Sequence, residues 1–316
     1  MQFKENQAYL PPKLLFNGQI QTVYPALFRK IKLLIPYIHE RIITQDRDFL
    51  DLFWMKQKNK KLVIISHGLE GNAQRAYVKG MANAHFAEGF DVLAWNYRGC
   101  SDQLNKLPKM YHSGATEDLL EVVNHAAKDY HEIYLIGFSL GANLTLKFLG
   151  EPGDHKKIKK ACVFAAPLDL KSGSLHLNTP KNHLYQRRFM RSLKKKARAK
   201  HAQFPGLFDL NKLEHTHNIY DFDDLITAPI HGFQHAEDYY EKCSAKNFLE
   251  NIQIPTYILN ALNDPFLTPN ILNSSIAGHL DHVSYQITPQ GGHCGYPNFT
   301  RKTYWSEAFA VNYFKS

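Results

Sequence analysis

Ser139 lies at the centre of the sequence G-F-S-L-G, residues 137–141, between two segments of different character. Residues 132–136 are short and apolar, which is typical of a buried strand, and residues 142–149 have the composition of a helix. A serine on a sharp turn from strand to helix has a strained backbone, and glycines two positions away on each side let the strand and the helix approach closely. The pattern therefore predicts that Ser139 is an exposed nucleophile.

A serine hydroxyl becomes reactive when a histidine takes its proton and an acid orients that histidine. With a turn of this kind, the acid and then the histidine are expected later in the chain. Asp264 follows an apolar segment at 255–261, and His293 follows another at 282–288. Ligands of open parallel sheets bind at such strand ends, so Asp264 and His293 are the predicted acid and general base. Asp281 is the weaker candidate for the acid, because it precedes a strand.

Attack of a serine on a carbonyl carbon creates a negative oxygen that needs two backbone N–H donors. One is expected from Leu140, the residue after the nucleophile. The other is expected from Leu69 in H-G-L-E-G, residues 67–71, where glycines on both sides of Leu69 and Glu70 give the loop freedom to turn. His67 could be a second base or a metal ligand, but we interpret it as a structural residue that holds this loop. No metal-binding spacing of histidine and glutamate occurs, so neither a metal nor another cofactor is expected.

The elements that must position these residues alternate between strand-like and helix-like segments, which indicates a mostly parallel sheet with helices on both faces. Strands are expected at 41–44, 49–55, 62–66, 90–95, 132–136, 161–166, 255–261 and 282–288. Helices are expected at 73–88, 116–130, 142–149 and from about Lys302 onward. From about Leu168 to Glu250 there is no convincing strand. We therefore predict one α/β domain over residues 1–316, with a helical cap inserted at about residues 168–250.

The totals agree with a globular enzyme inside the cell. The chain has 316 residues and 44% hydrophobic residues, enough for one large α/β domain. Its 4 cysteines are widely spaced without a C-x-x-C pair, which predicts reduced thiols rather than a disulfide framework. The first residues resemble no signal peptide, and the apolar segment 31–38 is too short to span a bilayer. A soluble, cytoplasmic protein is expected.

The formal net charge is +9, and a basic cluster at residues 187–200 contains no acidic residue. Its members are Arg187, Arg188, Arg191, Lys194, Lys195, Lys196, Arg198 and Lys200. One interpretation is a solvated helix face, and the other is contact with an anionic membrane surface or substrate. Nucleic acid is not an expected partner, because the cluster has no interleaved aromatic residues and belongs to no recognisable nucleic-acid module.

Aromatic residues of the expected cap leave a similar choice open. These residues are Phe189, Phe204, Phe208, Tyr220, Phe222 and Phe233. They could line a pocket for a hydrophobic acyl group, or they could form the core of a small helical cap. We also assign residues 111–114 and 221–224 to loop architecture and docking of the cap, not to catalysis.

Several longer motifs carry a family resemblance. They are N-G-Q-I-Q-T at 17–22, H-G-L-E-G at 67–71, N-Y-R-G-C at 96–100, Y-H-S-G-A-T-E-D at 111–118 and G-G-H at 291–293. Together they resemble the YheT-type hydrolases, bacterial relatives of eukaryotic α/β-hydrolase-domain lipases. The resemblance implies an α/β-hydrolase fold and a carboxylic ester hydrolase with the triad Ser139–Asp264–His293.

The leading prediction is therefore a serine esterase or lipase-like hydrolase that acts on esters of hydrophobic acyl groups through an acyl-enzyme. The substrate would be a small-molecule or lipid ester. An acyltransferase could use the same triad, since only the acceptor that resolves the acyl-enzyme differs. A third possibility is a catalytically silent lipid-binding protein on the same scaffold, against which the intact set of three residues argues.

Overall fold

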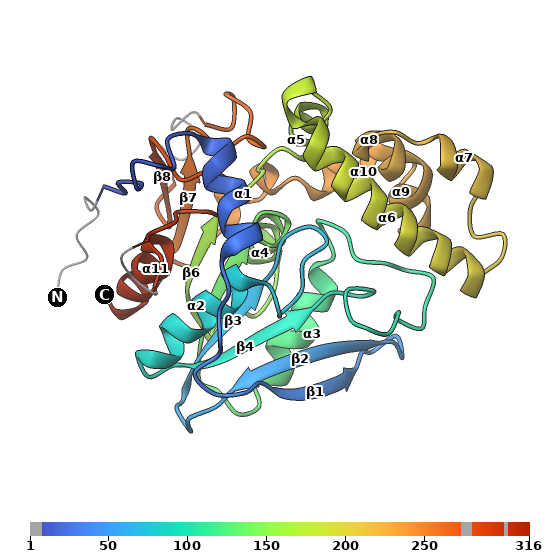
Figure 1. Ribbon diagram of the computed structural model, residues 1–316. Coiled ribbons are helices and arrows are strands. Elements are labelled where there is room, and N and C mark those ends of the chain that lie inside the picture. The colour runs from blue at the N-terminus through green and yellow to red at the C-terminus, as the bar shows by residue number, and fades with distance from the viewer. Residues whose placement is uncertain (1–7, 273–279, 300–302) are drawn as a thin grey trace.

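The computed structural model describes residues 8–272, 280–299 and 303–316. Within these residues, eight strands form one sheet in the order β1-β2-β4-β3-β5-β6-β7-β8 (Figure 1). The strands are β1 Ile38–Ile43, β2 Phe49–Met55, β3 Lys61–Ser66, β4 Asp91–Asn96, β5 Glu132–Phe138, β6 Ile158–Phe164, β7 Thr256–Ala261 and β8 Val283–Thr288. Strand β2 is antiparallel to β1 and β4, and the pairs from β4 to β8 are parallel.

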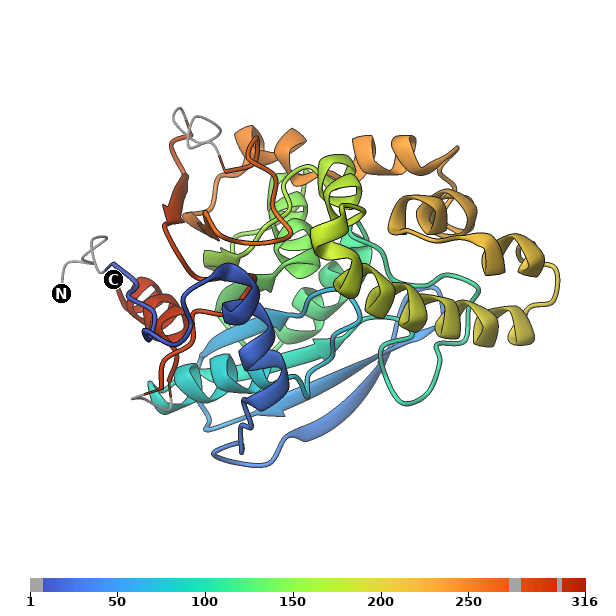
Figure 2. The same cartoon turned by 45° about the horizontal axis from the view of Figure 1, so that its top comes forward.

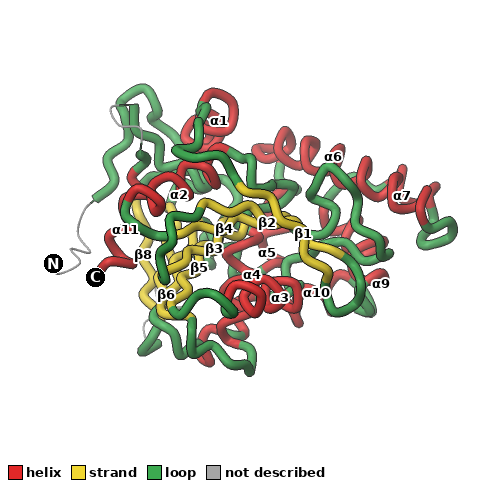
Figure 3. The backbone as a smooth tube through the Cα atoms, turned by 90° about the horizontal axis from the view of Figure 1, so that it is seen from below, coloured by secondary structure: helices red, strands yellow, loops and turns green. Residues whose placement is uncertain are grey.

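The central strands are buried on both faces, because helices cover each side of the sheet. Helices α2 (Ala76–Ala87) and α11 (Trp305–Lys315) share one apolar cluster with residues such as Val63. Helices α3 (Thr116–Ala126) and α4 (Leu140–Gly150) share another cluster, on the opposite face, with residues such as Ile64 (Figure 3). The side chains of consecutive strand residues point to opposite faces, so the unbroken apolar sequence of β3 serves both clusters. The predicted fold class is confirmed.

Helix α1 (Gly18–Phe28) precedes the sheet, and we did not expect it. The side chain of Asn17 caps it by accepting a hydrogen bond of 2.9 Å from the amide of Ile20. Pro25 lies inside the helix, a position that is unfavourable for proline. At the other end of the chain, α11 begins at Trp305, and the predicted start at Lys302 falls outside the described residues.

Between β6 and β7, residues 170–251 contain helices and no strand, a segment that we call the helical insertion. Its α-helices are α5 Leu170–Leu177, α6 His183–Gln203, α7 Leu210–His215, α8 Ile219–Phe222, α9 Ala228–Ile230 and α10 Ala236–Cys243. Figures 1 and 2 show these helices together on one side of the molecule, with α6 the longest. Within the described ranges, no helix has the length and apolar character needed to cross a bilayer.

Helix α6 is amphipathic, which explains how a very basic segment can be part of a folded protein. Its buried residues recur every three or four positions. They are Gln186, Met190, Leu193, Ala197 and Lys200. Most of the basic cluster therefore lies on the opposite, exposed face of the helix.

Candidate active site

Ser139 lies on the turn between β5 and α4 with φ 53° and ψ −115°, a left-handed conformation that is strained for a residue with a side chain. A Cβ on Gly137 would come within 2.4 Å of the carbonyl oxygen of Gly141, and a Cβ on Gly141 within 2.4 Å of that of Ser66. Both positions therefore require glycine. The turn presents the half-buried Ser139 at the C-terminal end of the central strand β5.

Asp264 and His293 come from the loops that follow β7 and β8, and the fold brings them together. The Nδ1 atom of His293 lies 2.9 Å from Oδ2 and 3.2 Å from Oδ1 of Asp264. Asp264 also accepts a hydrogen bond of 2.8 Å from the amide of Phe266, and its side chain is fully buried. Burial alone would lower the pKa of His293, but the adjacent Asp264 carboxylate stabilises the imidazolium more strongly, so the pKa lies above its ordinary value.

Ser139 and His293 both line two cavities that meet between them. The first, the insertion-side cavity, extends under the helical insertion and has a volume of about 120 Å³. The second, the α1-side cavity, extends toward α1 and has a volume of about 250 Å³. Leu69 and Phe266 also border both cavities. Among the described residues no hydrogen bond joins the side chains of Ser139 and His293, a contact that often tightens only when substrate binds.

The two predicted N–H donors lie beside Ser139. The amides of Leu69 and Leu140 have no hydrogen-bond acceptor among the described residues, and both residues line the insertion-side cavity. Leu140 is the first residue of α4, where the helix dipole favours negative charge. The loop around Leu69 comes close to the serine, since a Cβ on Gly68 would lie 3.2 Å from Cβ of Ser139. This arrangement can hold an anionic oxygen next to the serine hydroxyl.

Helix α1 positions the loop of His293, a role that sequence reasoning missed. The fully buried Gln21 accepts hydrogen bonds at Oε1 from the amide of Gly291 (2.8 Å) and from Nδ2 of Asn263 (3.0 Å). Thr22 Oγ1 accepts one of 2.8 Å from the amide of His293. The motif N-G-Q-I-Q-T therefore connects the loops that carry both Asp264 and His293. The signal in the sequence was an adjacent pair of polar residues, and nothing nearby in the chain indicated their partners.

Glu70 joins the Leu69 loop to the helical insertion. Its Oε1 lies 2.6 Å from Nζ of Lys196 and accepts a hydrogen bond of 2.7 Å from the hydroxyl of Tyr111. The hydroxyl of Ser192 donates to Oε2. Burial would raise the pKa of Glu70, but the ammonium of Lys196 outweighs burial and lowers it. The loop that carries one predicted donor is thus attached to α6 through an ion pair with little exposure to solvent.

The sequence also raised His67 as a second base or metal ligand and Asp281 as a weaker candidate for the acid. His67 is fully buried, and its Nδ1 lies 2.8 Å from the carbonyl oxygen of Gly68. Its ring packs against that of Tyr97, with 3.9 Å between the two ring centroids. Burial lowers the pKa of His67 to about 3, so its ring is neutral. Asp281 is exposed in the turn before β8, at the end of that strand away from His293. In the described part of the chain, no three His, Cys, Asp or Glu side chains gather as metal ligands do.

The structure divides the basic cluster of α6. Lys196 pairs with Glu70, Arg198 pairs with Glu214 at 2.6 Å, and Lys200 donates to the carbonyl oxygens of Asn105 and Leu107, at 2.6 Å each. Lys194 donates to the carbonyl oxygen of Glu214. The remaining four are exposed and have no ion-pair or hydrogen-bond partner among the described residues. They are Arg187, Arg188, Arg191 and Lys195.

The aromatic residues are divided in the same way. Phe222 lines the insertion-side cavity and Phe189 lines the α1-side cavity. Phe208, Tyr220 and Phe233 pack in the apolar clusters of the helical insertion and border neither cavity. Phe189 and Phe222 also pack in the first of these clusters, so both interpretations apply to these two residues, and Phe204 borders neither cavity.

Comparison with known proteins supplies the family. A family model described as the alpha/beta hydrolase fold matches residues 61–299, about three quarters of the chain. The chain belongs to the α/β-hydrolase family. The matched region includes the strand-to-helix turn of Ser139 and the loops of Asp264 and His293.

Individual relatives narrow the place of the chain within the α/β-hydrolases. One relative is YheT of Escherichia coli (strain K12), which is named as an esterase. It is 33% identical to this chain over 303 residues, which cover 93% of this chain and 88% of YheT. A monoacylglycerol lipase of Saccharomyces cerevisiae is 28% identical over 248 residues, 75% of this chain and 55% of the lipase. The resemblance to YheT-type hydrolases is confirmed, and the chain lies in an esterase- and lipase-like branch of the family.

Solved structures agree on the fold. The esterase EaEST of Exiguobacterium antarcticum superimposes with a TM-score of 0.59 at 16% identity, covering 88% of this chain and all of that one. At such low identity the match speaks for the α/β-hydrolase fold alone.

Proposed function

We propose that this protein is a serine hydrolase that cleaves carboxylic esters of hydrophobic acyl groups through an acyl-enzyme. In this proposal Ser139 is the nucleophile, His293 the general base and Asp264 the acid that orients it. The observation that carries the proposal is the pair of Asp264 and His293, 2.9 Å apart, on the same cavities as a serine at a strained strand-to-helix turn. The esterase and lipase names of the relatives support the same reaction class.

The proposed reaction has two halves that use the same groups. As Ser139 Oγ attacks the ester carbonyl carbon, Nε2 of His293 takes the hydroxyl proton, and the amides of Leu69 and Leu140 donate to the new oxyanion. The C–O bond to the alcohol then breaks, and the alcohol leaves with the proton from His293. Water attacks the acyl-enzyme in the same way, giving its proton to His293, which returns it to Ser139 as the acid is released. One oxyanion donor is worth on the order of 10²–10³ in turnover.

The two cavities fit the two parts of an ester. Apolar side chains make up most of the insertion-side cavity, and they suit a hydrophobic acyl chain. They include Met110, Leu170, Leu177, Leu193, Ile219 and Phe222. The α1-side cavity contains Arg75 and Arg188 and suits a more polar alcohol portion. An ester carbonyl at the junction would lie beside Ser139.

Labelling by a fluorophosphonate probe tests the proposal, because the probe reacts only with an activated serine. We expect wild-type protein to be labelled, and Ser139→Ala and His293→Ala to lose labelling while keeping the wild-type circular dichroism spectrum. Ser284→Ala, which changes an exposed serine of β8, is the matched control and should be labelled normally. Folded wild-type protein that stays unlabelled, even with detergent or anionic vesicles, would refute the proposal. Product analysis with added alcohols separates hydrolysis from acyl transfer.

We further propose that the exposed face of α6 contacts an anionic membrane surface. Arg187, Arg191 and Lys195 form a basic stripe at i, i+4 and i+8 that has no partner in the described part of the chain. Leu184, 79% exposed, precedes this stripe. Helix α1 contacts α6 at its start, where the hydroxyl of Tyr185 donates to Gln19 at 2.6 Å.

Vesicle sedimentation tests this contact. Each basic residue near an anionic surface contributes about 1 kcal/mol, so R187Q/R191Q/K195Q should weaken binding to phosphatidylglycerol-containing vesicles on the order of 100-fold. The control K128Q/K156Q/K159Q removes the same charge from exposed positions at the other end of the strands. Equal binding of both triple variants would contradict membrane contact through α6.

A further inference from the structure

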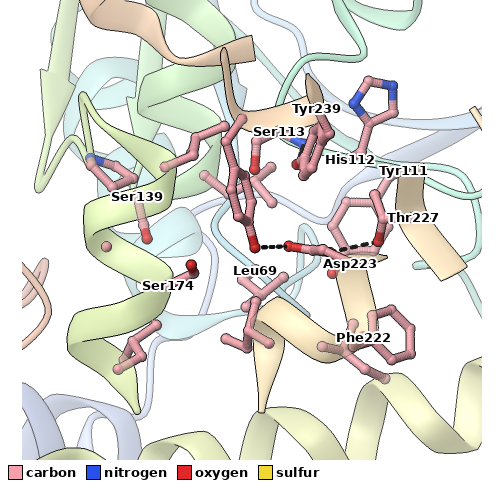
Figure 4. A pocket seen from close by; sticks show the side chains of 18 of the residues that line it. Leu69, Tyr111, His112, Ser113, Ser139, Ser174, Phe222, Asp223, Thr227 and Tyr239 are labelled. Carbon is pink, nitrogen blue, oxygen red and sulfur yellow. Dashed lines mark hydrogen bonds between the residues drawn. The ribbon is translucent and has the colours of Figure 1, made fainter. Parts of the chain in front are cut away.

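The insertion-side cavity contains an unexpected carboxyl group. Asp223 begins a π-helical turn, Asp223–Thr227, within the helical insertion, and its side chain lines this cavity. In Figure 4 Asp223 and Thr227 lie on one side of the cavity and Ser139 on the other. From the sequence we assigned Asp223 to docking of the cap. Its position in the structure is instead on the wall of the cavity that holds the proposed nucleophile.

Among the described residues, the carboxyl group has two hydrogen-bond partners, both neutral hydroxyls. Thr227 Oγ1 donates to Oδ1 at 2.6 Å, and the hydroxyl of Tyr240 donates to Oδ2 at 2.8 Å. Within the described residues no Lys, Arg or His forms an ion pair with Asp223. Lys196 lines the same cavity, but its ammonium is paired with Glu70. Each carboxyl oxygen can accept more than one hydrogen bond, so acceptor capacity remains for a group inside the cavity.

Burying the carboxyl group of Asp223 costs free energy unless a ligand completes its hydrogen bonds. Burial raises the pKa of Asp223 to about 6, with the hydroxyls of Thr227 and Tyr240 opposing the shift. A purely alkyl chain that filled the cavity would displace water from the carboxyl group and offer no hydrogen bond in return. A site built to hydrogen-bond a substrate hydroxyl discriminates strongly against the analogue without it.

We infer that Asp223, with Thr227 and Tyr240, forms a subsite for a hydroxyl group carried by the acyl chain that enters the insertion-side cavity. The hydroxyl of the substrate donates to a carboxyl oxygen of Asp223, while Thr227 and Tyr240 hold that carboxyl group in place with their own hydroxyl protons. A hydroxyl suits the site because it can donate to the remaining acceptor capacity of Asp223 without bringing a charge into a cavity lined mostly by apolar side chains. The inference rests on the proposed function and names the substrate class as esters of hydroxylated acyl chains.

Paired esters test this subsite. p-Nitrophenyl esters of straight-chain acids from four to ten carbons are compared with the same esters carrying a terminal hydroxyl, and kcat/KM is measured for each pair. In the wild-type protein the hydroxy ester should be preferred at one or two chain lengths. In Asp223→Leu the ratio of the two kcat/KM values should fall at least ~10-fold at those lengths, the effect of losing a hydrogen bond to a charged group. Because the ratio is taken within one variant, a general loss of turnover cancels.

Controls keep the outcomes separate. Asp224→Asn changes the exposed neighbour of Asp223 and should leave the ratio as in wild type. Tyr240→Phe and Asp223→Asn are measured as well, in case Asp223→Leu does not fold. The inference is wrong if wild type shows no preference at any length, if the ratio survives in all folded Asp223 and Tyr240 variants, or if an ester with a terminal amine is preferred. Folded wild-type protein that is not labelled by the fluorophosphonate and hydrolyses none of the esters would instead count against the proposed function.

Discussion

The loops at the C-terminal edge of the sheet and helix α6 of the helical insertion both border the cavities around Ser139, and they are held by different kinds of contact. At these loops, glycines in the first turns of helices α1 and α4 permit approaches that no larger residue allows. A Cβ on Gly18 would lie 1.7 Å from the carbonyl oxygen of Asn263, and one on Gly141 would lie 2.4 Å from that of Ser66. The backbone itself therefore fixes where Ser139, Asp264 and His293 can be.

Along α6 and the turn before it, polar side chains join the helical insertion to the sheet domain. Lys200 donates to two backbone carbonyl oxygens of the 105–107 loop, Asn182 donates to that of Pro265 at 2.7 Å, and Lys196 pairs with Glu70. Such contacts can adjust without rebuilding the backbone. We therefore expect changes in the edge loops to remove turnover, whereas changes in the insertion should alter which ester is used and how firmly the insertion is held.

Asp264→Asn should have the largest effect on the edge-loop side. The amide cannot stabilise the imidazolium of His293, so kcat is expected to fall on the order of 10⁴-fold while the fold is retained. Steady-state kinetics with a p-nitrophenyl ester, beside thermal unfolding, measures both. Asp281→Asn, at an exposed position before β8, is the matched control. A loss of less than tenfold in Asp264→Asn would assign the acid elsewhere.

The pH dependence of kcat/KM should follow His293. The base must be neutral to accept a proton, and the Asp264 carboxylate raises the pKa of His293, so activity should rise with pH through an apparent pKa above the usual value of about 6.5. Two pH units below that value, kcat/KM should be reduced on the order of 100-fold. In Asp264→Asn the residual activity should titrate at lower pH. A profile that is flat from pH 5 to 9 would argue against a histidine base.

Thr22→Val should have a smaller effect, because the hydroxyl of Thr22 acts through the position of His293 and not on the reacting atoms. Removing the hydroxyl leaves the amide of His293 without its 2.8 Å acceptor, and kcat should fall on the order of 10-fold with little change in KM. Thr22→Ser keeps a hydroxyl and should recover most of kcat. If Thr22→Val lowers thermal stability but not kcat, the role of α1 is structural only.

Glu70→Gln should change turnover least, because it tests how firmly the helical insertion is attached to the sheet domain. It leaves the nearly buried Lys196 without its partner, and the free energy of unfolding should fall by roughly 3 kcal/mol. Because the insertion is then less firmly attached, the preference among acyl chain lengths should broaden. Glu214→Gln breaks an exposed pair with Arg198 and should leave both properties unchanged. Chemical denaturation and a chain-length series test the two expectations.

The sequence alone predicted the features that depend on neighbouring residues. Alternating apolar strands and helices indicated the parallel sheet, and strand β2 was expected at its observed bounds. The turn of Ser139 was recognisable because its glycines and flanking segments lie within a few residues. The Leu69 loop, Asp264 and His293 were chosen because the C-terminal ends of parallel strands share one edge of a sheet. Helix ends were less accurate, since α3 stops at Ala126 rather than at 130.

Only the tertiary structure decided the contacts between distant segments. Gln21 and Gly291 are 270 positions apart, Glu70 and Lys196 are 126 apart, and nothing near either member of a pair indicates the other. The division of the basic cluster into paired and exposed residues also depends on which face α6 turns toward the sheet. Local backbone preferences are encoded within a few residues, whereas a hydrogen bond between distant side chains exists only once the hydrophobic layers have packed. The placement of Asp223 in the wall of the cavity follows from the same packing, which is why its sequence context suggested only a docking role.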